Sequence, residues 1–95
     1  MKEIILSSDG DRIVYLVPDD VADNLEKYCI EFCTDWIWNS PNAKHLRAQE
    51  YVCYNEEDFI EYLNNYIFPS QKSIFIKNLG HRIPFKYRKH PCFNF

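Results

Sequence analysis

Two of the four cysteines have a spacing that could serve metal binding. Cys29 and Cys33 lie four residues apart, which on a helix places both thiols on one face with about 6 Å between their Cβ atoms. Two such thiolates can share a zinc ion, and Cys53 with His45 or Cys92 could complete its four ligands. Structural zinc sites normally use two close ligand pairs, and this chain has one. We therefore favour small core residues at both positions, and expect no metal and no other cofactor.

No arrangement of residues indicates catalysis. A nucleophilic cysteine needs a lowered pKa and a nearby base, yet the cysteine pair lies in mid-helix, and Cys53 and Cys92 stand in no recognised motif. With only two glycines, the chain offers little to make a phosphate-binding loop. Four carboxylates cluster where a helix is predicted to begin, and there negative charge favours the helix dipole. They are Glu56, Glu57, Asp58 and Glu61. The sequence predicts a non-enzymatic protein without a small-molecule substrate.

The charges are unevenly divided along the chain, although the net charge is only −3. Residues 1–61 hold all 14 acidic residues and five bases, whereas residues 62–95 hold no acid and six bases. Those six are Lys72, Lys77, Arg82, Lys86, Arg88 and Lys89. Bases that alternate with aromatic residues over 83–95 are typical of segments that bind single-stranded nucleic acid. The acidity of the whole chain weighs against this function. It remains the second hypothesis, behind packing of the basic third against the acidic remainder.

The aromatic content favours a protein partner. Aromatic residues make up 17% of the sequence, more than one small core easily absorbs. Trp36 and Trp38 differ by about 200° around a helix, so one indole is expected at the surface unless residues 41–49 fold back over it. The predicted contact residues are Trp36, Trp38, Phe85, Tyr87, Phe93 and Phe95. They would bind another protein or a second copy of this chain, which would then form a homo-oligomer. The alternative is that Phe85, Tyr87 and Phe93 insert into the core.

The N-terminal elements that must position these residues begin with a β-hairpin over residues 3–17. Asp9-Gly10 lies between two β-prone runs and predicts a two-residue type I′ turn. That turn sets the cross-strand register. It pairs Leu6 with Ile13, Ile4 with Tyr15, Ile5 with Val14 and Ser7 with Arg12. Apolar residues at every third or fourth position then predict an amphipathic helix over residues 20–38.

The rest of the chain is predicted to hold further helices and an extended tail. Asn55 and Asp58 have the spacing of a capping box and predict a second long helix over residues 56–68. Residues 71–79 fit either a helix or a strand, and we favour a helix. The tail should be extended, with an edge strand at residues 85–88.

A shorter helix is expected between the two long ones. It would cover residues 42–49, with Ser40 as its cap and Pro41 at its first position. Together these elements predict one α+β domain over residues 1–95.

The expected location is the cytoplasm. The apolar run near the N-terminus, residues 4–6, is far shorter than that of a signal peptide. No stretch approaches the roughly 18 apolar residues of a membrane helix, so no membrane contact is expected. The four cysteines are therefore expected as reduced thiols.

Overall fold

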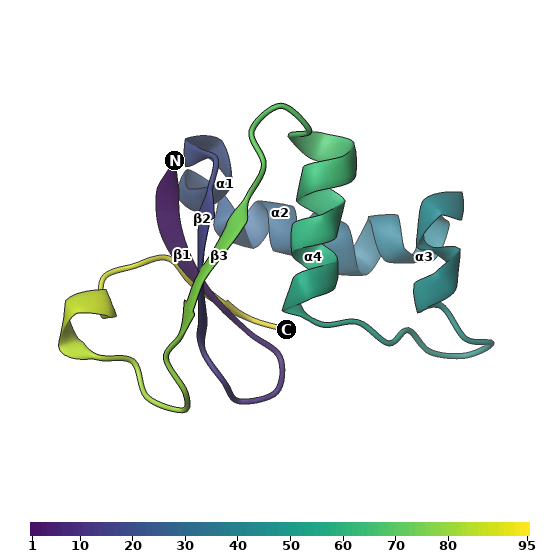
Figure 1. Cartoon of the computed structure of the whole chain (residues 1–95). Coiled ribbons are helices and arrows are strands. Elements are labelled where there is room, and N and C mark those ends of the chain that lie inside the picture. The colour runs from purple at the N-terminus through teal and green to yellow at the C-terminus, as the bar shows by residue number, and fades with distance from the viewer.

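A four-stranded mixed sheet forms the centre of the protein. The computed structural model describes residues 1–95. Strands β1 (Lys2–Ser7) and β2 (Ile13–Val17) form an antiparallel hairpin. Strand β3 (Ile74–Asn78) pairs antiparallel with β2, and β4 (Cys92–Asn94) pairs parallel with β1. The strand order is therefore β3-β2-β1-β4 (Figure 1). The α+β class predicted from the sequence is confirmed, with two more strands than the hairpin alone.

The hairpin has the predicted register but a different turn. Three expected pairs are present, Ile4 with Tyr15, Ile5 with Val14, and Leu6 with Ile13. The pair of Ser7 with Arg12 is not part of the ladder, because both backbones bond to the C-terminal part of the chain. The carbonyl oxygen of Ser7 accepts from the Phe95 N–H at 2.8 Å, and the Arg12 N–H donates over 2.8 Å to the turn after β3. Gly10 has a φ of 95°, but Asp9 does not share its positive φ. The type I′ turn was therefore a wrong prediction.

The first helical region covers residues 19–39 and is interrupted twice. It consists of α1 (Asp19–Asp23), α2 (Leu25–Glu31), a π-helical turn η1 (Phe32–Trp36) and α3 (Ile37–Asn39). At the first break, Asn24 has a φ of −131°. Its side-chain amide donates to the Asp20 carbonyl oxygen at 3.1 Å and to the Asp20 carboxylate at 2.9 Å. Such local bonds compete with helical ones, so the expectation of one continuous helix over residues 20–38 was wrong in its interior.

A 3₁₀ helix and an extended segment connect the two helical regions. The 3₁₀ helix, η2 (Pro41–Leu46), is shorter than the predicted helix over residues 42–49. Its cap is as predicted, because the Ser40 hydroxyl accepts from the Asn42 N–H at 3.2 Å. The guanidinium of Arg47 donates to the carbonyl oxygens of Ile37 and Ser40 at 2.9 and 2.8 Å and so closes this connection onto α3.

The second long helix begins where the sequence predicted. It comprises α4 (Glu56–Tyr62) and a π-helical turn η3 (Leu63–Ile67). The side chain of Asn55 accepts from the Asp58 N–H at 3.1 Å, and the Asp58 carboxylate accepts from the Asn55 N–H at 2.9 Å. Both halves of the predicted capping box are therefore present.

Removal of this cap should destabilise the protein measurably. Asn55→Ala is expected to lower the free energy of unfolding by about 1 kcal/mol, because it leaves the Asp58 N–H without its side-chain acceptor. Urea denaturation followed by circular dichroism would measure the loss. Asn65→Ala, at an exposed position of η3, is the matched control and should change stability by less than about 0.5 kcal/mol. Equal losses in the two variants would contradict a capping role.

Two predictions for the C-terminal third were wrong. Residues 71–79 hold no helix, because β2 offers an open edge and residues 74–78 pair with it as β3. The Asn64 side chain fixes the approach to this strand, donating to the Ser73 carbonyl oxygen at 3.1 Å and accepting from the Ser73 N–H at 2.6 Å. Residues 85–88 are not an edge strand, because residues 85–87 turn as the 3₁₀ helix η4 (Phe85–Tyr87). The second outer strand is β4 instead.

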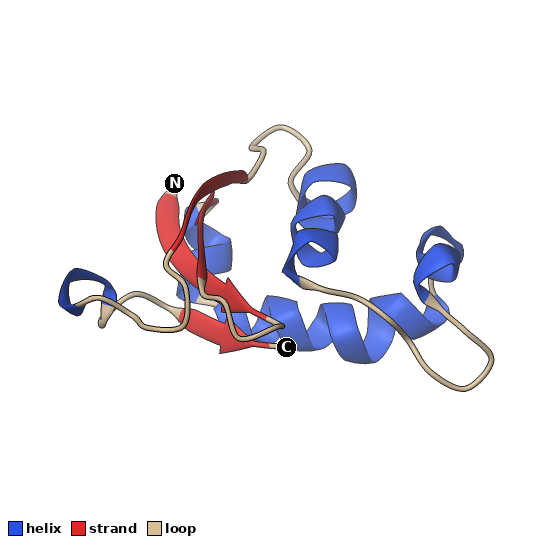
Figure 2. Ribbon diagram, turned by 60° about the horizontal axis from the view of Figure 1, so that its bottom comes forward, coloured by secondary structure: helices blue, strands red, loops and turns tan.

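The two faces of the sheet carry separate hydrophobic clusters. The larger cluster joins Ile4, Leu6 and Tyr15 to the helices through side chains such as Phe32 and Phe59. The smaller cluster, on the other face, consists of Ile5, Val14 and Tyr87. Figure 2 shows the helices on one side of the strands and η4 on the other. None of the helices is both long and apolar enough to cross a membrane.

Candidate functional site

The six predicted contact aromatics differ sharply in exposure. Trp36 packs on Phe32, Tyr62 and Tyr66, with ring centroids 5.7, 4.9 and 5.3 Å away. Phe93 and Phe95 are half-buried against the larger cluster, and Tyr87 is 4% exposed in the smaller one. Trp38 is 46% exposed and Phe85 is 83% exposed. One tryptophan therefore lies at the surface, as expected. Of the tail aromatics, Phe85 alone projects into solvent.

A tight turn forces Phe85 outward. The Tyr87 N–H donates to the Pro84 carbonyl oxygen at 2.9 Å, and the Arg88 N–H donates to that of Phe85 at 3.2 Å. Within this turn the Tyr87 side chain inserts against Ile5 and Val14, on the sheet face opposite the helices. Tyr87 is directed inward, whereas Phe85 is exposed at the start of η4, a turn that projects beyond the sheet (Figure 1).

Three basic residues line a hollow together with Phe85. Phe85, Lys86, Arg88 and Lys89 line one shallow hollow, and we name these four residues the Phe85 surface. The guanidinium carbon of Arg88 lies 5.3 Å from the centroid of the Phe85 ring, within the range of a cation–π contact. The Lys86 ammonium lies 5.2 Å from the Tyr87 centroid, and that of Lys77 lies 5.4 Å from the same ring. Aromatic rings are therefore close partners of Lys77, Lys86 and Arg88, whereas Glu3 shares a second hollow with Lys86 and Lys89.

The basic third is not neutralised by direct ion pairs. The close pairs in the structure are those of the N-terminal amine with Asp19, Lys2 with Asp23, His81 with Asp11 and His90 with Glu3. None of the six bases in residues 62–95 takes part in them. Lys72 precedes β3 and Arg82 follows it, so these two lie at opposite ends of that strand. Lys86, Arg88 and Lys89 therefore lie beside Phe85 without a direct ion pair.

The proposed zinc ligands are not brought together. Cys29 is buried in the larger cluster, Cys33 is half-buried, and His45 and Cys53 are exposed. No three His, Cys, Asp or Glu side chains in the structure lie close enough together to hold a metal ion. Burial raises the pKa of the Cys29 thiol strongly, so this group keeps its proton and behaves as a small apolar residue. The structure therefore does not assemble the four proposed zinc ligands, and Cys29 lies in the core as expected.

Cys33 has a different environment from Cys29, its partner one helical turn away. Its thiol approaches the Ile30 carbonyl oxygen at 3.8 Å. Burial, with Cys33 as neighbour, raises the pKa of the Tyr54 hydroxyl. The helical spacing of the pair therefore serves packing on Phe32 and its neighbours.

Comparison of the chain with family models, with curated proteins and with solved structures finds no match in any of the three.

Proposed function

We propose that this chain is a non-enzymatic binding protein that docks an acidic segment of a partner protein on the Phe85 surface. The partner would cover the Phe85 ring and place carboxylates against Lys86, Arg88 and Lys89. We place this activity in the cytoplasm, where the four unpaired cysteines would remain reduced.

The exposure of Phe85 carries this proposal. A phenylalanine that is 83% exposed contributes little to the core, yet it occupies the tip of an ordered turn. Aromatic and arginine side chains that become buried on association supply much of the binding energy at protein interfaces. Arg88 lies over the Phe85 ring, so one partner group could contact both. The free charge around them favours an acidic partner and would speed its approach.

Single-stranded nucleic acid is the second candidate for the same surface. The cations favour it, because Lys86, Arg88 and Lys89 have no carboxylate partners. The aromatic arrangement is less favourable, since binding a single strand uses several rings that stack on successive bases. With Tyr87 buried, one exposed ring remains on this surface. An oligonucleotide titration at about 50 mM salt would test this candidate, with a salt-sensitive affinity as its signature.

The main test compares partner capture by the native chain and by two variants, Phe85→Ala and the control Tyr51→Ala. The native chain and Phe85→Ala would each be immobilised and exposed to the same lysate of the source cells. We expect loss of Phe85 to weaken partner binding by about 2 kcal/mol, or thirty-fold, as is typical of an aromatic hot spot. Captured proteins would be identified by mass spectrometry and their affinities measured by calorimetry.

The control is an exposed aromatic residue from another part of the molecule. Tyr51 is 65% exposed and belongs to the segment between η2 and α4. This segment lies at the end of the molecule remote from η4 (Figure 1). Tyr51→Ala should retain the partner at native affinity. A partner captured equally by both variants would place the interface elsewhere. Light scattering distinguishes a second copy from another protein, since only self-association would raise the mass of the purified native chain.

A further inference from the structure

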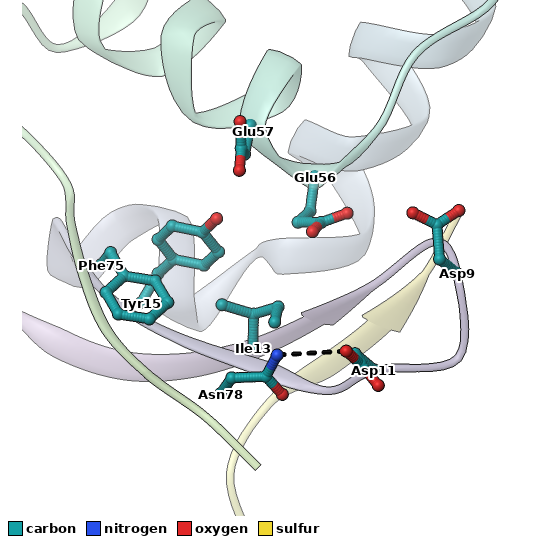
Figure 3. Close-up of a pocket in the computed structure, with 8 residues that line it drawn as sticks. All are labelled: Asp9, Asp11, Ile13, Tyr15, Glu56, Glu57, Phe75 and Asn78. Carbon is teal, nitrogen blue, oxygen red and sulfur yellow. Dashed lines mark hydrogen bonds between the residues drawn. The ribbon is translucent and has the colours of Figure 1, made fainter. Parts of the chain in front are cut away.

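A separate hollow lies on the helix side of the sheet. It has a volume of about 260 Å³ and lies between the hairpin turn, strand β3 and the beginning of α4 (Figure 3). Its lining residues are Asp9, Asp11, Ile13, Tyr15, Glu56, Glu57, Phe75 and Asn78. It is smaller than the roughly 300 to 1,000 Å³ of drug-sized ligand sites, so its size suits one side-chain-sized group.

The rim of the hollow is acidic and has no lysine or arginine. Two of its carboxylates have polar partners: Asp11 accepts from the Asn78 amide at 3.1 Å, and Glu56 accepts from the Ser8 hydroxyl. Asp9 and Glu57 are exposed and take part in no ion pair. The His81 ring lies 3.8 Å from Asp11, and the Arg12 guanidinium donates to the Gly10 carbonyl oxygen of the same turn at 3.2 Å. The lining of the hollow therefore carries four carboxylates and no lysine or arginine.

The floor of the hollow is aromatic and contains an unpartnered hydroxyl. Tyr15 is 4% exposed, and its ring meets Phe75 edge to face with centroids 6.0 Å apart. Figure 3 shows its hydroxyl directed away from β2 toward α4. No protein group forms a hydrogen bond with this hydroxyl. Burial, with Glu56 and Glu57 nearby, raises the pKa of Tyr15 to about 12, so the group stays neutral at physiological pH. The hydroxyl oxygen is not sealed in the core but opens into the hollow, where a bound group could reach it.

We propose that this hollow binds an organic cation, an ammonium or guanidinium group on a short apolar stem. The carboxylates of the rim would pair with the charge, the Tyr15 hydroxyl would accept one of its N–H bonds, and the stem would lie on Ile13 and Phe75. A bare metal ion fits less well, because no three of these carboxylates lie close enough together to coordinate one. This proposal does not depend on the Phe85 surface, which lies on the other face of the sheet.

The test is an NMR titration of the full chain labelled with ¹⁵N. The probes are n-butylammonium chloride and n-butylguanidinium chloride. The controls are n-butanol, which has the same butyl chain without a charge, and sodium chloride at matched ionic strength. Saturable shifts of the amides of Asp9, Tyr15, Glu57 and Phe75 are expected with the two cations only. Equal shifts with butanol, or with salt alone, would overturn the proposal.

Substitutions in the hollow separate a specific site from general charge attraction. Glu57→Gln should weaken binding about two- to five-fold, the range expected for one exposed charge pair. Tyr15→Phe should weaken it about two- to ten-fold through loss of the hydroxyl acceptor. Glu26→Gln, which removes an exposed carboxylate on α2, is the matched control and should have no effect. If all three variants bind alike, the hollow is not the site.

Two sources could supply such a cation, and further probes distinguish them. Spermidine represents a free polyamine, and the peptide Gly-Arg-Gly represents a basic side chain of a partner protein. The probe that binds the native chain more tightly, and that binds the Tyr15→Phe variant more weakly than the native chain, identifies the source. Failure of both probes to show that loss would reject the proposal, whatever the result at Phe85.

Discussion

Phe32→Ala is expected to lower the free energy of unfolding by about 3 to 5 kcal/mol, the largest loss among the substitutions considered. Phe32 is fully buried in η1, where five aromatic rings have centroids between 5.2 and 6.0 Å from its own. The rings are those of Trp36, Tyr54, Phe59, Tyr62 and Phe95. They come from the first helical region, the loop before α4, α4 itself and the C-terminus. Loss of one side chain would therefore open a cavity shared by elements distant in sequence.

Chemical denaturation would measure this loss, and the chain offers a control with the same chemical change. Phe85→Ala also removes a phenyl ring, but from an exposed position, so its stability should change by less than about 0.5 kcal/mol. A typical domain has about 5 to 15 kcal/mol of stability, so Phe32→Ala could leave a fraction of the protein unfolded at 25 °C. Phe32→Leu, which keeps most of the volume, should then fold and lose less. Similar losses in the two alanine variants would mean that Phe32 does not organise the core.

Local patterns in the sequence were sufficient for the elements that are stabilised locally. The hairpin register follows from alternation of apolar residues, because a slip of one residue would turn Ile4 and Leu6 away from the helices. The capping box at Asn55 and the cap at Ser40 depend on residues two or three positions away. Each of these predictions concerned contacts between residues that are close in the chain or paired across one turn.

The errors arise where distant segments compete for the same backbone groups. The hairpin turn widens because Phe95 and the turn after β3 bond to Ser7 and Arg12. Residues 74–78 become a strand because β2 has a free edge, and nothing within 71–79 reveals that edge. Helix and strand were both compatible with this segment, and long-range pairing decided between them.

The candidate sites were predictable to different degrees. The basic and aromatic character of the tail singled out Phe85 and its neighbours, but alternation in an extended chain would place Phe85 and Tyr87 on one side. The 3₁₀ turn separates them instead. The acidic hollow was missed because its two halves lie more than 40 residues apart in the sequence. At Glu56 and Glu57, moreover, the helix dipole offered a sufficient local explanation.

The sheet keeps the two charged regions apart. Tyr15 and Phe75 lie on the helix side, beneath the acidic rim, whereas Ile5 and Val14 face the basic tail. Adjacent residues of β2 therefore support surfaces of opposite charge. This arrangement explains how a chain with a net charge of −3 can present a strongly basic surface. It also means that the attachment of the tail to the sheet decides whether the Phe85 surface exists.

Tyr87 provides that attachment, and Tyr87→Ala should therefore affect stability and binding together. Loss of the buried ring uncovers Ile5 and Val14 and should cost about 3 kcal/mol of unfolding free energy. Tyr87→Phe keeps the ring and should stay within about 0.5 kcal/mol of the native chain.

Partner capture at a temperature where the alanine variant is still folded gives the second readout. There, Tyr87→Ala should bind as weakly as Phe85→Ala, because η4 loses the contact that orients Phe85, whereas Tyr87→Phe should bind normally. Native affinity in folded Tyr87→Ala would show that the turn holds its shape without the sheet. In that case the turn formed by residues 84–90 would itself carry the binding surface, held by its own backbone hydrogen bonds, in which the N–H groups of Tyr87, Arg88 and His90 donate to the carbonyl oxygens of Pro84, Phe85 and Tyr87.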